Sequence, residues 1–375
     1  MKSIISLFVA LFALIASVCA APQLFVSEYE NDGKALTQSS RQGTIVDKLR
    51  EDKRFSRFVE VLEQERGLRD DLENREKQTT LFAPTNEAFK HMEDQWRNSK
   101  DEEKPSMRDV LRYHIAPDSQ ISGDCLHAGA LIPTNLRLKS LEDRHQRIRV
   151  FRFHGEVWLN MHARVVQKDL EAENGLIHAI DRCLMPPMTI GEMLYTMPTR
   201  FSTSLAAFER TGLQEVCTKK GITVFAPTNR AWETLGFDNL RYLFSCMGQQ
   251  KPSEGRSIFG GEEHPQCEGT KMLKKILKYH IATKLAYSTD LMEKETTRLG
   301  TMEGKNLEVC AVHTEGHKGR DEKKHHDVRN YNFVINKGQA RIAFSDGLGS
   351  NGAVQVIDSV LIPDDVKLPH DRWMA

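Results

Sequence analysis

The chain has 375 residues, which is enough for two domains of ordinary size. Its 52 basic and 52 acidic residues give a formal net charge of +0. This balance excludes nucleic-acid binding as a property of the whole surface, because nucleic-acid-binding proteins usually carry a basic patch or a high isoelectric point. We therefore expect no nucleic acid among the partners.

Residues 1–20 predict a cleaved signal peptide. Lys2 supplies a positive start, residues 4–18 are almost wholly apolar, and small residues precede Ala21. An uncleaved signal anchor is the alternative, but its apolar core is short for a membrane span, which needs about 20 apolar residues. No second long apolar run follows, so we expect no transmembrane segment after cleavage. The expected location is the secretory pathway, with a secreted, cell-wall or vacuolar destination.

The rest of the chain contains one unit twice, because three sequence blocks recur in the same order. They predict domains at 42–187 and 188–365. The second copy is longer, and its extra residues coincide with two polar stretches, 248–269 and 314–327, that are typical of surface loops. The matching blocks are residues 81–89 (LFAPTNEAF) and 224–232 (VFAPTNRAW), residues 111–116 (LRYHIA) and 277–282 (LKYHIA), and residues 174–186 (NGLIHAIDRCLMP) and 351–363 (NGAVQVIDSVLIP).

The first block predicts a strand followed by a helix. Residues 79–82 and 222–225 are β-branched and apolar. The proline that ends each strand cannot donate a hydrogen bond to a central ladder. The threonine or asparagine after the proline can cap the next helix. We expect this block to serve as scaffold.

The second block predicts the end of a helix. Apolar residues at helical spacing precede Tyr113 and His114 in the first copy and Tyr279 and His280 in the second. A charged histidine near a helix C-terminus interacts favourably with the helix dipole, and a neutral one can be buried and hydrogen-bonded. A structural role and a direct binding role therefore both stay open for these four residues.

The third block predicts an extended segment that begins with a tight turn. The Asn-Gly pairs at 174–175 and 351–352 are strong turn signals. The residues that follow alternate between two faces, as in a strand. Asp181 and Asp358 each stand without a second carboxylate or a base, so we expect them to cap backbone groups rather than to catalyse a reaction.

Six cysteines follow the predicted leader, and an even number in an oxidising compartment favours disulfides. They divide between the copies, so each copy can pair its thiols internally. We expect Cys246 to bond with Cys267, which would close the first insertion and restrain the unfolded chain by about 3 kcal/mol. The remaining disulfide candidates are Cys125, Cys183, Cys217 and Cys310.

A histidine-rich segment near the second insertion offers a possible metal site. His313, His317, His325 and His326 lie close in sequence with several acidic residues, and imidazole suits zinc, copper and nickel. A solvated charged loop is the favoured interpretation, because a flexible loop rarely holds tetrahedral geometry without a scaffold. Metal binding is thus the alternative function.

The three repeated blocks resemble the opening, Tyr-His and closing motifs of the fasciclin, or FAS1, domain. The resemblance implies two compact α+β domains, each a β-sandwich or wedge flanked by helices. In animal relatives the Tyr-His region is linked to cell adhesion, which by position implies a binding role for Tyr113, His114, Tyr279 and His280. One position departs from the pattern, since the closing motif has His178 in the first copy and Gln355 in the second. Glutamine keeps hydrogen-bonding capacity but cannot titrate.

The sequence predicts a non-enzymatic protein without a cofactor. It contains no Gly-x-Ser-x-Gly nucleophile elbow and no His-Glu-x-x-His zinc helix. The family resemblance implies adhesion or another interaction, with a protein or glycan partner at the cell surface, in the matrix or in the vacuole. The two-domain layout with a short linker and a polar tail is similar to that of fungal members, some of which are assigned to the vacuole.

Overall fold

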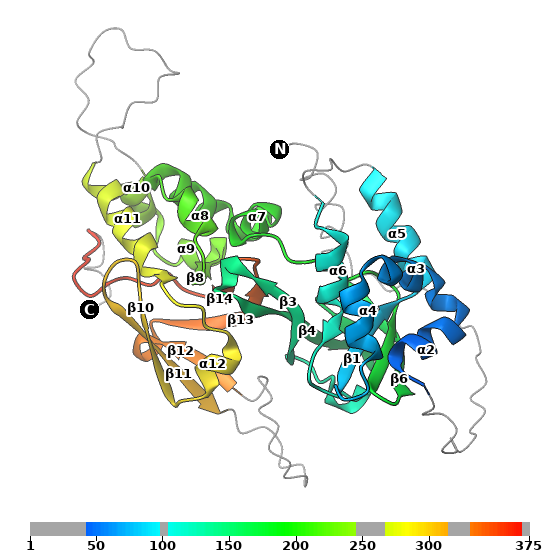
Figure 1. Ribbon diagram of the computed structural model, residues 1–375. Coiled ribbons are helices and arrows are strands. Elements are labelled where there is room, and N and C mark those ends of the chain that lie inside the picture. The colour runs from blue at the N-terminus through cyan, green and yellow to red at the C-terminus, as the bar shows by residue number, and fades with distance from the viewer. Residues whose placement is uncertain (1–42, 98–103, 245–266, 314–330, 370–375) are drawn as a thin grey trace. The chain divides into compact units, whose positions relative to one another are not determined.

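The computed structural model describes residues 43–97, 104–244, 267–313 and 331–369 (Figure 1). The predicted leader, most of the first predicted insertion and all of the second lie outside these residues, so they stay predictions. The chain divides into two compact units. Of the described residues, one unit comprises those up to Leu138 together with Asp143–Pro186, and the other comprises Lys139–Glu142 together with those from Pro187 onward.

The first unit is an α+β domain built on one seven-stranded sheet, in the order β2-β1-β7-β6-β5-β4-β3. Strand β1 pairs in parallel with β7, and the other neighbours are antiparallel. The elements are α2 (Ile45–Glu51), η2 (Lys53–Phe55), α3 (Ser56–Gln64), α4 (Arg66–Glu73), β1 (Thr79–Pro84), α5 (Asn86–Arg97), α6 (Met107–Tyr113), β2 (Ile115–Ala116), η4 (Gly123–Cys125), β3 (Leu131–Leu138), η5 (Lys139–Leu141), β4 (Arg144–Phe153), β5 (Glu156–Leu159), β6 (Ala163–Ala172) and β7 (Gly175–Ile180).

The second unit repeats this architecture strand for strand, in the order β9-β8-β14-β13-β12-β11-β10. Strands β8 and β14 are the parallel pair that corresponds to β1 and β7. The elements are α7 (Ile190–Thr196), α8 (Pro198–Thr211), η6 (Gln214–Thr218), β8 (Ile222–Pro227), α9 (Asn229–Glu233), α10 (Phe237–Phe244), α11 (Glu268–Tyr279), β9 (Ile281–Ala282), α12 (Ser288–Met292), β10 (Thr296–Gly300), β11 (Asn306–His313), β12 (Tyr331–Ile335), η8 (Asn336–Gly338), β13 (Ala340–Leu348) and β14 (Gly352–Ile357). The predicted duplication of an α+β unit is confirmed.

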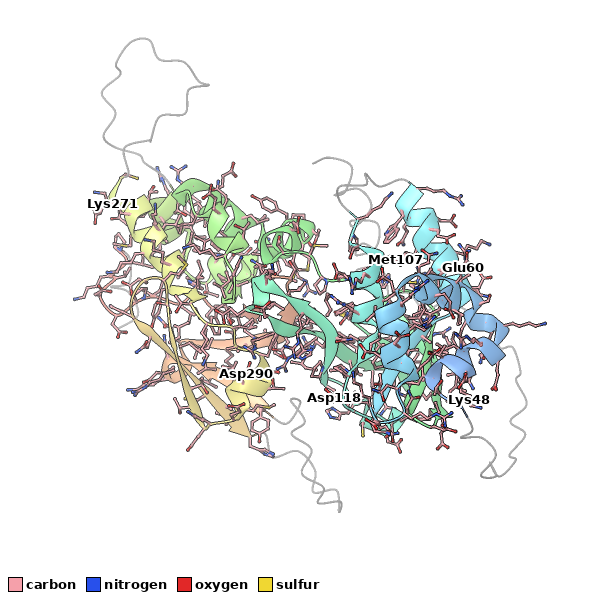
Figure 2. The ribbon with its side chains drawn as sticks, in the orientation of Figure 1. Lys48, Glu60, Met107, Asp118, Lys271 and Asp290 are labelled. Atoms are coloured by element: carbon pink, nitrogen blue, oxygen red, sulfur yellow. The ribbon has the colours of Figure 1, made fainter. Side chains whose placement is uncertain are left out.

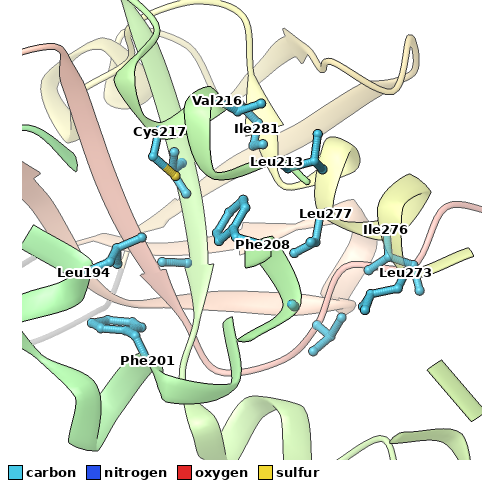
Figure 3. Close-up of a cluster of buried hydrophobic side chains, with 14 of the residues drawn as sticks. Leu194, Phe201, Phe208, Leu213, Val216, Cys217, Leu273, Ile276, Leu277 and Ile281 are labelled. Atoms are coloured by element: carbon cyan, nitrogen blue, oxygen red, sulfur yellow. The ribbon is translucent and has the colours of Figure 1, made fainter. Parts of the chain in front are cut away.

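Each domain buries apolar side chains on both faces of its central strands. Every residue of β1 and of β8 is buried, which fits their apolar, β-branched sequences. In the second domain the cluster on the helical side joins α7, α8 and α11 to β8 and β14 (Figure 3). Phe82 and Phe225 lie in the opposite clusters, each beside the tyrosine of the second repeated block. The two phenylalanines therefore have equivalent surroundings.

The first repeated block forms the predicted strand and helix in both copies. The hydroxyl of Thr228 accepts a hydrogen bond from the Ala231 amide at 3.1 Å and caps α9. The asparagine that follows each threonine serves a different purpose. Asn86 Oδ1 accepts from the Arg57 amide at 3.0 Å, and Asn229 Oδ1 accepts from the Thr203 amide at 3.0 Å, so each side chain ties the new helix to a preceding one.

The helices among the described residues include none that is long and apolar enough to cross a bilayer.

Candidate functional site

The histidine of the second block joins the end of α6 to the segment after β7. The His114 side chain is buried, and its Nδ1 lies 2.7 Å from the carbonyl oxygen of Val110. Its Nε2 accepts a hydrogen bond from the Leu184 amide at 2.9 Å. An amide can only donate, so Nε2 carries no proton and the ring is the neutral Nδ1–H tautomer.

The second copy repeats this arrangement at His280. Its Nδ1 lies 2.8 Å from the carbonyl oxygen of Ile276, and its Nε2 accepts from the Leu361 amide at 3.0 Å. Burial lowers the pKa of each histidine from 6.5 to about 4, against a smaller opposing effect of the carbonyl hydrogen bond. Both rings are therefore uncharged at neutral pH, and neither acts as a cation for the helix dipole.

The tyrosine of the second block bonds to an asparagine that sequence reasoning missed. Tyr113 Oη donates to the Arg147 carbonyl at 2.8 Å and accepts from Asn160 Nδ2 at 2.8 Å. In the second domain Tyr279 Oη donates to the Asn306 carbonyl at 3.2 Å and accepts from Asn336 Nδ2 at 2.9 Å. These two asparagines form a fourth repeated feature of the chain.

Both asparagines have a left-handed backbone, with φ of 52° at Asn160 and 48° at Asn336, a conformation that asparagine tolerates better than most residues. The signal in the sequence is weak. Each asparagine follows an apolar residue that ends a strand, and an Ala-Arg pair follows a few residues later, at 163–164 and 340–341. A comparison of the two copies at this point would have found the match.

The closing-motif position uses two different residues for the same task. His178 Nε2 lies 2.7 Å from the Ile121 carbonyl oxygen, and its Nδ1 accepts from the Asp169 amide at 3.2 Å. Gln355 donates through Nε2 to the Ala286 carbonyl at 3.1 Å and accepts through Oε1 from the Asp346 amide at 3.1 Å. Both side chains are fully buried. The amide of glutamine thus replaces the imidazole as one donor and one acceptor.

The asparagine of the Asn-Gly pair has a structural task beyond its turn. Asn174 lies in the predicted tight turn, between β6 and β7, and is buried. Its Oδ1 accepts from the Ile45 amide at 2.8 Å, and its Nδ2 donates to the carbonyls of Leu72 and Asn74 at 2.7 and 3.1 Å. One side chain therefore holds the start of α2 and the end of α4 against the sheet.

Asn351 makes the corresponding three bonds. It accepts from the Ile190 amide at 2.9 Å and donates to the carbonyls of Cys217 and Lys219 at 2.7 and 2.8 Å.

Close packing requires a glycine after this asparagine in both copies. A Cβ at Gly175 would lie 1.8 Å from the Thr79 carbonyl oxygen, and one at Gly352 would lie 2.1 Å from that of Ile222.

The repeated polar side chains are thus committed to hydrogen bonds inside their own domains. Tyr113, His114, Tyr279 and His280 have exposed fractions of 0, 1, 5 and 1%. A direct binding role for them stays a prediction, since such contact requires these rings to leave the core. The aspartates at the end of the closing motif cap backbone as predicted, with Asp181 Oδ1 accepting from Arg164 N and Asp358 Oδ1 from Arg341 N, both at 2.8 Å.

Four of the six disulfide candidates are not bonded. Cys125, Cys183, Cys217 and Cys310 are free thiols. Cys183 and Cys217 are packed in the apolar clusters beneath the helices, whereas Cys125 is exposed and Cys310 is half-exposed on β11. A disulfide needs a separation of about 6 Å between Cα atoms and suitably directed side chains, which membership of the same copy does not supply. Burial raises the pKa of the Cys183 and Cys217 thiols to about 12, so both are unreactive.

The fifth candidate, Cys267, is disulfide-bonded. Cys246 lies outside the described residues, so the Cys246–Cys267 pairing stays a prediction.

Most of the proposed metal site also stays a prediction, because His317, His325 and His326 lie outside the described residues. His313 ends β11, where its ring meets Tyr331 edge to face at 5.3 Å. Within the described part of the chain, three or more His, Cys, Asp or Glu side chains nowhere gather closely enough to hold a metal ion.

Replacing His178 with glutamine should change the stability of the first domain by less than about 1 kcal/mol, because Gln355 already satisfies the equivalent groups. Replacing it with alanine should cost about 3 kcal/mol, since a buried carbonyl and a buried amide lose their partner. Urea unfolding of both variants measures the difference. Equal losses for glutamine and alanine would show that the imidazole itself is needed.

The sequence model described as "Fasciclin domain" matches residues 53–186 and 199–363. The pig transforming growth factor-beta-induced protein ig-h3 (Sus scrofa) is 37% identical over 145 residues, which cover 39% of this chain and 20% of that protein. The aurofusarin biosynthesis cluster protein S of Gibberella zeae is 24% identical over 341 residues, 85% of this chain and 77% of that protein. This chain matches only about a fifth of the length of the ig-h3 proteins of pig and rabbit. A solved FAS1 domain pair from the insect cell adhesion molecule Fasciclin I covers 84% of this chain and 98% of its own, with 20% identity and a TM-score of 0.38.

Proposed function

Since the chain belongs to the fasciclin domain family, we propose that it is a non-enzymatic interaction protein of the secretory pathway, with FAS1 domains at 42–187 and 188–365. Its role is adhesion, through a protein or glycan partner at the cell surface, in the matrix or in the vacuole. Adhesion is the role that the family resemblance implies, and the neutral overall charge fits a partner other than nucleic acid.

One observation carries this proposal. The tyrosine and histidine of the second block and the asparagine of the Asn-Gly pair, which recur in both copies, are buried, and their hydrogen bonds go to groups of their own domain. A catalytic group must reach a substrate, and these groups do not. What the duplication preserves is therefore a scaffold, and the exposed residues, which differ between the copies, carry the interactions.

The Tyr-His residues then act on binding indirectly, by fixing the ends of α6 and α11. Replacing Tyr113 with phenylalanine removes only the hydroxyl that contacts Arg147 and Asn160. We expect this variant to lose about 1–2 kcal/mol of stability and to keep full adhesion while it stays folded. Tyr279→Phe is the matched variant of the second domain.

The measurement is attachment of the organism's own cells to surfaces coated with the mature chain, with folding checked by circular dichroism. Failure of the folded wild-type coat to retain cells or any extracted matrix or wall component would refute the adhesion role. Loss of attachment by a folded Tyr113→Phe coat would instead show that the hydroxyl contacts the partner directly.

A further inference from the structure

Helix α11 of the second domain carries a row of lysines along one face. Lys271, Lys274, Lys275 and Lys278 follow the spacing of a single helical face, while Leu273, Ile276 and Leu277 on the other side enter the core. Figure 2 labels Lys271 near the start of this helix. The four lysines extend over roughly 10 Å along the helix axis, at about 1.5 Å per residue.

The row lines a shallow surface groove rather than a flat face. The groove is lined by the four lysines and by Met302 and Glu303 from the turn between β10 and β11. The Glu303 carboxylate is 9% exposed and lies 3.6 Å from Lys275 Nζ. We call these six residues the lysine groove.

Acidic neighbours neutralise only part of this charge. Lys275 pairs with Glu303 and with Asp365, and Asp365 also pairs with Lys305. Lys271, Lys274 and Lys278 form no ion pair with an acidic residue among those that the structure describes. Three ammonium groups thus stay available to a ligand in a concave site, where like charges strengthen the local field.

The first domain shows that the fold does not need the complete row of four charges. When the Tyr-His blocks are aligned, Pro105, Arg108, Asp109 and Arg112 occupy the positions of Lys271, Lys274, Lys275 and Lys278. Arg108 there lies 3.5 Å from the Glu65 carboxylate. Ser106 caps the helix by accepting from the Asp109 amide, and its hydroxyl donates to the Asp109 carboxylate. The buried side of the helix is apolar in both copies, whereas the first copy keeps two of the four positive charges and the second has all four.

We propose that the lysine groove binds a linear anionic glycan, with sulfate or carboxylate groups contacting Lys271, Lys274 and Lys278. This inference rests on the proposed interaction role and specifies its partner. A single row of cations the length of a disaccharide matches a chain with regularly spaced charges. A linear chain contacts the whole row, and the flexible ammonium groups contact its anions as point charges.

The test is calorimetric titration of the full mature chain with a heparin hexasaccharide, with an oligogalacturonate hexamer, and with a neutral chitin hexamer. Binding of either anionic oligosaccharide, weakening as salt rises, supports the proposal and tells sulfate from carboxylate recognition. The variant Lys271→Gln/Lys274→Gln/Lys278→Gln should bind about tenfold more weakly. The control Lys219→Gln/Lys220→Gln/Lys294→Gln removes the same charge from exposed positions of the same domain and should bind like the wild type.

Equal weakening by both triple variants would overturn the proposal, because it would reduce the effect to net charge. So would binding to vesicles containing phosphatidylserine without binding to either anionic oligosaccharide. Folding of each variant is checked by its urea unfolding midpoint, which should stay unchanged because Lys271 is exposed and Lys274 and Lys278 lie outside the core. If the chain still retains cells while no anionic glycan binds, the lysine-groove inference fails and the adhesion role stands.

Discussion

Replacing Asn174 with alanine should destabilise the first domain by about 3 kcal/mol or more, which is a large part of the stability of an ordinary domain. The change leaves the Ile45 amide and the carbonyls of Leu72 and Asn74 without their partner in a buried site. Hydrogen exchange read by mass spectrometry should show amide protection in β1 and β7 falling by about a hundredfold.

The second domain supplies the matched variant. Asn351→Ala should lower protection in β8 and β14, because Asn351 makes the same three bonds there. Asn332 is exposed on β12, and its replacement by alanine should change neither region. A small effect of Asn174→Ala together with a large effect of Asn351→Ala would mean that this asparagine does not stabilise the interior of both domains in the same way.

Lowering the pH from about 6.5 to about 4 should destabilise both domains through His114 and His280. The unfolded chain binds a proton at each histidine near pH 6.5, whereas the folded chain does so only near pH 4. The stabilising contribution of each neutral ring is therefore complete above pH 6.5 and is lost as the pH falls toward 4. The lowered pKa corresponds to roughly 3 kcal/mol per histidine.

The physical cause is the amide that faces Nε2. A protonated ring would direct an N–H at the N–H of Leu184 or Leu361, and one buried hydrogen bond would become a repulsion. Burial also lowers the pKa of His162 and His178, so these two histidines add to the slope in the first domain. Carboxylates with lowered pKa, such as Asp365 at about 2, contribute only in stronger acid.

Urea unfolding between pH 7 and pH 4.5 measures this loss. The double variant His114→Gln/His280→Gln should be less stable at pH 7 but should show a much smaller decrease on acidification. His91 is exposed on α5, and His91→Gln should keep the full pH dependence of the wild type. An unchanged slope in the double variant would assign the acid sensitivity to other groups.

The sequence predicted those parts of the fold that repeat as contiguous blocks. The strands that begin at Thr79 and Ile222, the helices that end at Tyr113 and Tyr279, and the tight turn at Asn174 all lie where local patterns placed them. These features depend on periodicity, proline and turn chemistry within a few residues, which a sequence displays directly.

The partners of the buried polar groups could not be predicted in the same way. Asn174 bonds with residues about 100 positions away, and His114 with an amide 70 positions away. The equivalence of His178 and Gln355 also depends on where a bulged neighbouring strand places one amide and where the segment after β2 or β9 places one carbonyl. Cysteine pairing failed for a related reason, since an even number of thiols does not determine their separation.

His114 and His280 are neutral and buried, and they hold equivalent positions in two copies of one folding unit. Nitrogen NMR of the histidine rings of the full chain at pH 7, combined with amide exchange at Leu184 and Leu361, tests this equivalence most directly. We predict the Nδ1–H tautomer at both rings and strong protection of both amides. An Nε2–H tautomer or a rapidly exchanging amide in either domain would contradict the account.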